Sequence, residues 1–263
     1  MVELNKSGFV TLAGAGPGDA ELITLKLQKR LTEADVIITD RLVNPDIISV
    51  HSRKDALILF AGKQGYNDNS YSQEEVTALV IEHALLGKRV LRLKGGDVAF
   101  FSNVLDELNV LTEKNIPFEI IPGITAASGA SAYAGIPLTA REHSQGVQIL
   151  TYNPTSYYNP ETWKHLANSP NTLVFYMAAK NICDLAELLL RYSKKPFTRL
   201  AVIEQATTIH QQVHITTLKE CEKDFADKAF SSPSLVIIGD VVKLHEQFNW
   251  FITTDEGTIF QNL

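Results

Sequence analysis

Short apolar runs alternate with helix-like segments along most of the chain, and this alternation constrains the fold more than any other feature. In the first half the predicted strands are residues 9–13, 34–40, 89–93 and 118–121. A capping box, Ser72-Gln-Glu-Glu75, predicts a helix that ends at Gly87, and a second helix is expected over 102–115. Asp19 is the expected N-cap of a helix carrying Leu22, Leu25 and Leu31.

The same pattern restarts after about residue 145. Strands are predicted at 147–152, 172–177, 200–205 and 235–238, and helices at 181–192 and from Pro160 onward. Residues 210–215 favour some antiparallel pairing. We therefore predict an α/β protein of two domains: residues 1–142 with a mostly parallel sheet, and residues 143–247 with a mixed sheet. The active-site cleft is expected between them, and residues 248–263 are expected to form a tail.

Composition narrows the class of protein. Over 263 residues, 24 Lys and Arg stand against 30 Asp and Glu, so the formal charge of −6 argues against a general nucleic-acid binder. The start lacks a signal-peptide pattern, and no apolar run approaches a membrane span of about 20 residues, so we expect a cytoplasmic protein without membrane contact. Cys183 and Cys221 are too few for a disulfide framework and are expected to be buried bystanders.

Two glycine turns follow predicted strands. Gly14-Ala-Gly-Pro-Gly-Asp19 occupies the place of a dinucleotide fingerprint, but Asp stands where the third glycine is needed, and its carboxylate would repel a pyrophosphate. Lys94-Gly-Gly-Asp97 is the second turn. Bare backbone beside carboxylates favours a neutral or cationic ligand over a nucleoside phosphate. His210 and His214 have a metal-binding spacing for a helix, but their segment is predicted to be extended, so no metal site is expected.

Several segments together carry a family resemblance. They are 13–19 (AGAGPGD), 40–43 (DRLV), 62–63 (GK), 92–97 (RLKGGD), 122–126 (PGITA), 132–139 (AYAGIPLT) and 173–177 (LVFYM). In this order and spacing the chain, from about residue 8 to 245, resembles the class III S-adenosylmethionine-dependent tetrapyrrole methyltransferases. Within that family it is most similar to the branch that methylates uroporphyrinogen III.

The resemblance implies a homodimer of two-domain subunits, with S-adenosylmethionine folded into the cleft between the domains. The positions that match the family's cofactor contacts are Pro17, Gly95, Gly96, Asp97, Phe100, Thr125, Ala126, Met177 and Ala206. Phe100 stands where the family usually has a smaller aliphatic residue. Asp97 suits this ligand because a carboxylate accepts hydrogen bonds from its ribose or ammonium groups.

The implied reaction is C-methylation of uroporphyrinogen III at C2 and C7 to precorrin-2, a precursor of siroheme and cobalamin, with release of S-adenosylhomocysteine. The methylated ring must lose a proton, which calls for a base. By resemblance Asp40 is the proton acceptor and Lys63 a proton donor or orienting group. The candidates for binding the substrate carboxylates are Arg41, Arg92, Lys94 and Arg141.

Three positions depart from the family pattern. Asn103 replaces an arginine, Thr39 a tyrosine and Ala140 a histidine, which bears on the substrate more than on the cofactor. The alternatives are methylation of a later corrin intermediate on the same scaffold, and a non-catalytic protein that binds S-adenosylmethionine or a tetrapyrrole. A dinucleotide oxidoreductase is disfavoured by Asp19.

The sequence leaves two further points less constrained. Tyr152, Tyr157 and Tyr158 lie in the loop at 151–160 and would suit either a lid over a flat macrocycle or an ordinary surface loop. The glycine turn begins by residue 14, so no dehydrogenase or chelatase extension is expected before it.

Overall fold

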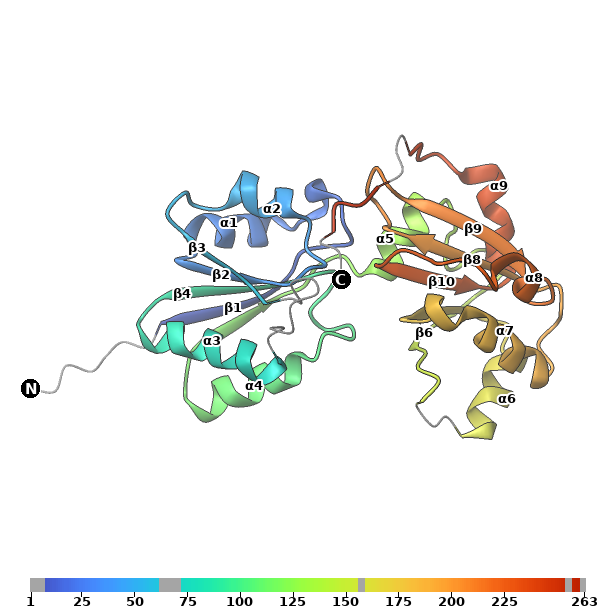
Figure 1. The fold of residues 1–263 in the computed structure, drawn as a ribbon, viewed down its shortest axis with the longest axis horizontal. Helices are drawn as coiled ribbons and strands as arrows, with labels where there is room; N and C mark the ends of the chain where they lie inside the picture. The colour runs from blue at the N-terminus through green and yellow to red at the C-terminus, as the bar shows by residue number, and fades with distance from the viewer. Residues whose placement is uncertain (1–7, 62–71, 156–158, 254–256, 261–263) are drawn as a thin grey trace, which may run out of the picture. The chain divides into compact units, whose positions relative to one another are not determined.

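The structure is a computed structural model that describes residues 8–61, 72–155, 159–253 and 257–260. The chain folds into two compact units: unit 1 is Met1–Thr125 with Thr258–Leu263, and unit 2 is Ala126–Gly257. Each unit is built on its own five-stranded sheet. Figure 1 draws the two units with their strands and helices. Two α/β domains, the first with a parallel sheet and the second with a mixed one, are confirmed.

Unit 1 carries a fully parallel sheet in the order β3-β2-β4-β1-β5. Its strands are β1 (Phe9–Gly14), β2 (Val36–Thr39), β3 (Leu57–Phe60), β4 (Arg89–Lys94) and β5 (Phe118–Ile121). The helices α1 (Leu25–Glu33) and α2 (Pro45–His51) cover one face, and α3 (Gln73–Leu85) and α4 (Val104–Glu113) cover the other (Figure 1). Because both faces are covered, successive residues of β1 and β2 enter two separate apolar clusters.

Unit 2 has a mixed sheet in the order β6-β7-β10-β8-β9. The strands are β6 (Val147–Thr151), β7 (Thr172–Tyr176), β8 (Arg199–Glu204), β9 (Gln212–Thr217) and β10 (Ser234–Ile238). Only the β6–β7 pair is parallel. The helices are α5 (Ala126–Tyr133), α6 (Pro160–Asn168), α7 (Ile182–Arg191), α8 (Cys221–Phe225) and α9 (His245–Phe248). β7 and β8 both run antiparallel to β10, so their C-terminal ends lie at the same edge of the sheet.

The division between the units falls at residues 125 and 126, earlier than the predicted boundary at 142. The reason is α5, a helix that the sequence pattern does not predict. Its small residues Ala127 and Ala130 are buried against Val174 and Ala201 of the second sheet. The helix therefore belongs to unit 2, and the chain crosses between units just before it.

The end of the chain also differs from the predicted tail. Trp250 Nε1 donates a hydrogen bond to the carbonyl of Ala132 at 2.9 Å, and the rings of Trp250 and Phe251 pack against Tyr133. Further on, the carbonyl of Gly257 accepts from Gln205 Nε2 at 2.7 Å. These contacts attach the described residues of this segment, up to Gly257, to unit 2.

The first helix begins later than the sequence predicts. Asp19 caps a three-residue 3-10 turn, Ala20–Leu22, and α1 begins only at Leu25, where Thr24 is the N-cap. Leu25 is exposed, and the buried face carries Leu27 and Leu31 instead. The capping box at Ser72 and the Asn159-Pro160 helix start are confirmed.

Candidate functional site

Three glycine turns of unit 1 meet at the C-terminal ends of adjacent strands. Gly16 after β1 and Gly96 after β4 exchange both backbone hydrogen bonds, at 3.0 and 2.7 Å. Both residues have left-handed φ values, +83° and +67°, which glycine adopts without a steric penalty. A Cβ on Gly123, after β5, would lie 2.3 Å from the carbonyl oxygen of Gly96. Only bare backbone allows this packing, and it brings the three turns to the sheet edge where α/β folds bind ligands.

The Asp97 carboxylate joins two of these turns. One oxygen accepts from the N–H of Ala99 at 2.7 Å and the other from the N–H of Gly123 at 2.8 Å. Asp97 is buried, so the structure gives this predicted cofactor residue a role in holding the turns together. Each oxygen keeps a further lone pair, so each can accept one more hydrogen bond.

Asp40 follows β2, one strand away from β1 across β4. Its Oδ1 accepts from the N–H of Leu42 at 3.0 Å, and its side chain is about one quarter exposed, at 25%. Its Oδ2 lies 3.9 Å from Nη2 of Arg92, which is beyond hydrogen-bond length. The predicted proton acceptor is therefore fixed by its own turn and open to solvent on one side.

Two of the predicted substrate-binding cations lie below the surface. Arg92 and Lys94 are buried, and both pair with Glu107 of α4, whose side chain is 0% exposed. Arg92 Nε donates to Glu107 Oε1 at 3.0 Å, and Lys94 Nζ lies 2.6 Å from Glu107 Oε2. Burial lowers the pKa of Lys94, and the neighbouring Glu107 carboxylate opposes that shift. Both cations are occupied inside the protein, so this structure does not offer them to substrate carboxylates.

Sequence reasoning did not single out Glu107, although a signal was present. It lies on α4 at helical spacing with Val104, Leu108 and Leu111, which pack into the apolar cluster under β1 and β4. A glutamate in an apolar stripe is rarely buried without a partner.

The remaining predicted residues of unit 1 differ in exposure. Pro17 is buried, Gly95, Thr125 and Arg41 are half-buried, and Phe100 is 41% exposed. Asn103, at the position of the family's arginine, has a left-handed φ of +52° and is the N-cap of α4 without a side-chain capping bond. Lys63, Tyr157 and Tyr158 lie outside the described residues.

In unit 2, Met177 follows β7 and Ala206 follows β8, so they lie at the same edge of the second sheet. Met177 is 65% exposed with a left-handed φ of +58°, which excludes a core role for it here. Ala206 is buried, and its neighbours in the chain, Gln205 and Thr207, both have left-handed φ values. Ala126 begins α5, and the next residue, Ala127, donates its N–H to Tyr176 Oη at 2.8 Å. Arg141 is exposed and has no ion-pair partner among the residues the structure describes.

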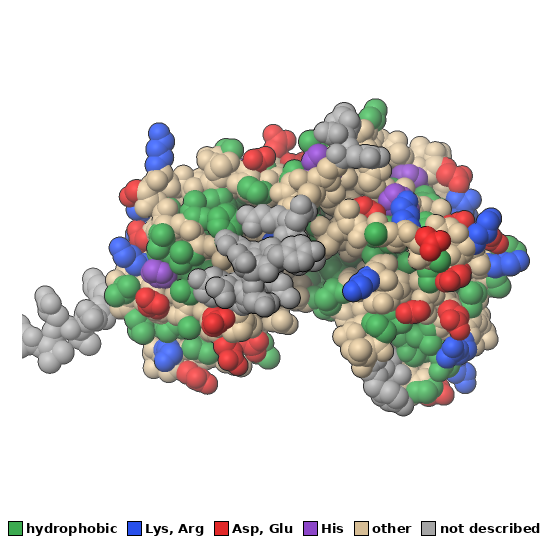
Figure 2. Space-filling view, viewed as in Figure 1, with side chains coloured by type: hydrophobic (Ala, Val, Ile, Leu, Met, Phe, Trp, Pro, Cys, Tyr) green, Lys and Arg blue, Asp and Glu red, His purple; other side chains and the backbone are tan. Residues whose placement is uncertain are grey.

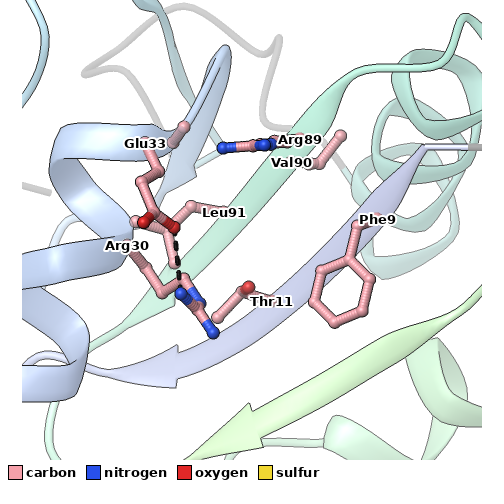
Figure 3. A pocket seen from close by; sticks show the side chains of 8 residues that line it. Phe9, Thr11, Arg30, Glu33, Arg89, Val90 and Leu91 are labelled. Atoms are coloured by element: carbon pink, nitrogen blue, oxygen red, sulfur yellow. Dashed lines mark hydrogen bonds and ion pairs between the residues drawn. The ribbon is translucent and has the colours of Figure 1, made fainter.

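Two cavities of unit 1 lie away from this edge. One, of about 300 Å³, is bordered by Phe9, Arg30, Glu33 and Arg89 (Figure 3). It lies at the N-terminal ends of β1 and β4, whereas the glycine turns follow the C-terminal ends. The other, of about 920 Å³, lies between α3 and α4. Over the described part of the face drawn in Figure 2, Lys and Arg side chains are interspersed with Asp and Glu. Neither cavity touches the glycine turns, so neither is the predicted site.

His214, one of the two histidines considered as metal ligands, has an acidic neighbour in the structure. His214 lies on β9, where its Nε2 is 3.2 Å from Glu204 Oε1, and β9 pairs antiparallel with β8 as expected. Across the described ranges, no group of three or more His, Cys, Asp and Glu side chains is arranged to hold a metal ion. None of the described helices is long and apolar enough to cross a membrane.

Comparison with known proteins agrees with the resemblance. Residues 10–222 match the family described as Tetrapyrrole (Corrin/Porphyrin) Methylases. The siroheme synthase of Edwardsiella ictaluri is 46% identical over 244 residues, which are 93% of this chain and 52% of that protein. That of Actinobacillus succinogenes is 43% identical over 246 residues, 94% of this chain and 51% of that protein. The chain thus spans about half the length of these curated relatives.

Solved structures give the same result. A uroporphyrin-III C-methyltransferase from Thermus thermophilus has a TM-score of 0.75 and 32% identity, covering 90% of this chain and 100% of that one. The same enzyme complexed with S-adenyl homocysteine matches at a TM-score of 0.75 and 30% identity, covering 90% and 94%. A cobalt precorrin-4 methyltransferase matches with a TM-score of 0.79 and 25% identity, and the match covers 92% of this chain and 99% of that one. The chain belongs to the tetrapyrrole (corrin/porphyrin) methylase family.

Proposed function

We propose that this protein transfers methyl groups from S-adenosylmethionine to carbon atoms of uroporphyrinogen III, giving precorrin-2. The main support is the combination of 46% identity to a siroheme synthase with a TM-score of 0.75 to a uroporphyrin-III C-methyltransferase. The position of Asp40 at the strand edge that carries the glycine turns supports it independently.

The turns fit such a cofactor chemically. Packed backbone at Gly16, Gly96 and Gly123 provides a surface without side chains, and Asp97 keeps the turns in register. Arg92 and Lys94 share the buried Glu107 carboxylate, and Asp40 lies next to Arg92. The formal charges of these four groups sum to zero, which reduces repulsion of a cationic sulfonium. When bound, S-adenosylmethionine supplies a methyl group that is already activated. Pro17, Gly95, Gly96 and Asp97 would hold it on unit 1, and Met177 and Ala206 are the proposed contacts on unit 2.

The contribution of the chain is alignment and proton removal. As the pyrrole β-carbon forms its new C–C bond, the C–S bond breaks and positive charge develops on the ring, which then loses a proton. We assign Asp40 as the acceptor of that proton, because its carboxylate is oriented by the Leu42 N–H and is partly open to solvent. Most of the rate enhancement is expected from alignment. Arg41 and Arg141 remain the proposed contacts for substrate carboxylates.

The test is anaerobic incubation with uroporphyrinogen III and S-adenosylmethionine, followed by absorbance and by the mass of two added methyl groups. Asp40→Asn, which keeps shape and loses the base, is expected to lower kcat by at least about 100-fold. Asp46→Asn on α2, an exposed acidic residue nearby, is the control and should retain activity. Cofactor binding without product would contradict the assigned substrate.

A second candidate is methylation of a later corrin intermediate. The observation that favours it is the TM-score of 0.79 to a cobalt precorrin-4 methyltransferase. Asn103 supports it too, because the family's arginine is missing at that position. Parallel incubations with uroporphyrinogen III and with cobalt-containing precorrins separate the two reactions.

A homodimer, a cytoplasmic location, a site without metal and the lack of nucleic-acid and membrane partners stay predictions. The cleft between the domains and the proton-donor role of Lys63 stay predictions as well.

A further inference from the structure

Three charged side chains, those of Glu107, Arg92 and Asp40, form a row from the interior of unit 1 to its surface, and Asp40 is the proposed base. We call this row the charge chain. Glu107, on α4, is 0% exposed and is the buried end of the charge chain. Arg92, in the central strand β4, is its middle, and Asp40, 25% exposed, is the open end. Lys94 makes a side branch on Glu107. Two carboxylates and two cations therefore lie in one connected cluster.

Three hydrogen bonds fix the Arg92 guanidinium, and none of the three is to Asp40. Its Nε donates to Glu107 at 3.0 Å, and its Nη1 donates to the carbonyls of Leu93 at 3.1 Å and Ile38 at 3.3 Å. Its Nη2, by contrast, is 3.9 Å from Asp40 Oδ2. A direct bond between a guanidinium and a carboxylate measures about 2.7–2.9 Å. The guanidinium is thus fixed just outside a full ion pair with the base.

Stability alone does not account for this arrangement. Burying charges has a large desolvation cost, and well-packed apolar residues of similar volume are often as stable as a buried ion pair. A base that were fully paired with Arg92 would also be a weaker proton acceptor, because the guanidinium favours its ionised form. The observed geometry keeps Arg92 Nη2 3.9 Å from Asp40 while its Nε is bonded to Glu107.

We propose that Glu107 is a positioning residue that holds Arg92 out of a full ion pair with Asp40, leaving the Asp40 carboxylate available to accept the ring proton. This inference rests on the proposed function for its kinetic consequence. Its structural consequence does not depend on that function. Without the carboxylate at position 107, Arg92 loses its charged partner and turns toward the remaining acidic group, Asp40.

The structural test is a crystal structure of Glu107→Gln beside those of the unmodified chain and of Glu113→Gln, a matched change at an exposed position of the same helix. In Glu107→Gln the Arg92 Nη2 to Asp40 Oδ2 distance is expected to fall to about 2.9 Å. In the other two proteins it should stay near 3.9 Å. An unchanged distance in a folded Glu107→Gln would overturn the proposal whatever the enzyme's substrate.

The kinetic test separates positioning from packing. Glu107→Gln is expected to lower kcat about tenfold, while the Kd for S-adenosylmethionine, measured by calorimetry, stays within about twofold. Adding Arg92→Met removes the group that captures Asp40, so the double variant should recover kcat to within about threefold of the unmodified enzyme. Independent damage to packing would instead make the double variant worse than either single one.

The double variant also covers a failure of Glu107→Gln to fold, because it leaves fewer unpaired buried charges. If it folds and its kcat stays more than about tenfold low, the proposal is wrong. An unmodified chain that binds S-adenosylmethionine and methylates no tetrapyrrole would contradict the proposed function alone, and the crystallographic distance would still decide the role of Glu107.

Discussion

The Asp97 carboxylate and the backbone N–H of Gly123 lie 26 residues apart in sequence and form a 2.8 Å hydrogen bond. This bond fastens the turn after β5 to the turn after β4, while the other Asp97 oxygen holds Ala99. A residue that family resemblance assigns to ligand contact therefore also holds together the turns on which the cofactor is proposed to bind. Its two roles are separable by experiment.

Asp97→Ala is expected to lower the free energy of unfolding by about 2 kcal/mol, because the backbone N–H groups of Ala99 and Gly123 lose a buried, charged acceptor. Urea unfolding measures this loss, and calorimetry should show weaker binding of S-adenosylmethionine. Asp97→Asn keeps one acceptor oxygen, so its free energy of unfolding should lie between those of the unmodified chain and of Asp97→Ala. Asp227→Ala, at an exposed position, is the control and should change neither quantity. Full stability in Asp97→Ala would contradict the fastening role.

The two cysteines face each other across α7 and α8, with sulfur atoms 4.0 Å apart. Burial raises the pKa of both thiols, that of Cys221 strongly. Because the thiolate is the reactive form, we expect slow alkylation of both residues in the folded protein at neutral pH. Mass spectrometry after iodoacetamide treatment, with and without urea, tests this. Rapid modification of Cys221 without urea would show that α8 opens readily.

Glu119 on β5 forms ion pairs with two residues of α1, Arg30 and Lys26. Lys26 Nζ lies 2.7 Å from Glu119 Oε2. The hydrogen bond from Arg30 lowers the pKa of Glu119 to about 2. A lowered pKa means that this contribution to stability is complete above the ordinary value of 4.5 and is lost as the pH falls toward 2. Glu119→Gln should therefore cost about 1 kcal/mol at neutral pH, a figure reduced for solvent screening.

Urea unfolding across the acid range measures this dependence. The stability difference between Glu119→Gln and the unmodified chain should shrink steadily below pH 4.5 and vanish near pH 2. Glu187→Gln removes a carboxylate from an exposed ion pair on α7 and should change the free energy by less than about 0.5 kcal/mol. A difference for Glu119→Gln that did not change with pH would mean that packing, not charge, carries its effect.

Much of the fold could be predicted because local signals are strong where strands are apolar and helices are capped. Ser72 and Glu75 form the expected capping box, and Asn159 caps the helix that Pro160 opens. Helix α5 could not be predicted in this way because its sequence, AASGASAY, has little apolar contrast. Its burial comes from small residues fitting closely against the second sheet, a tertiary effect that periodicity does not report.

The site was predictable only in part, for a similar reason. Glycine turns and a carboxylate after a strand are visible in sequence, and the structure brings them to one sheet edge. Arg92 and Lys94 look like substrate contacts because charged residues are usually exposed. Their burial depends on Glu107, which is contributed by a helix that follows in the chain. Pairing between distant residues is set by the fold, so it becomes visible only in three dimensions.

Met177 gives a prediction in which stability and binding change in opposite directions. Its left-handed φ of +58° strains a residue that has a Cβ, and its side chain is 65% exposed. Met177→Gly should therefore raise the free energy of unfolding by about 0.5 kcal/mol. If Met177 contacts S-adenosylmethionine as proposed, the same change should weaken binding about tenfold by calorimetry. Phe197→Ala, also at an exposed position, should leave binding unchanged. Equal affinity in Met177→Gly would remove Met177 from the proposed site.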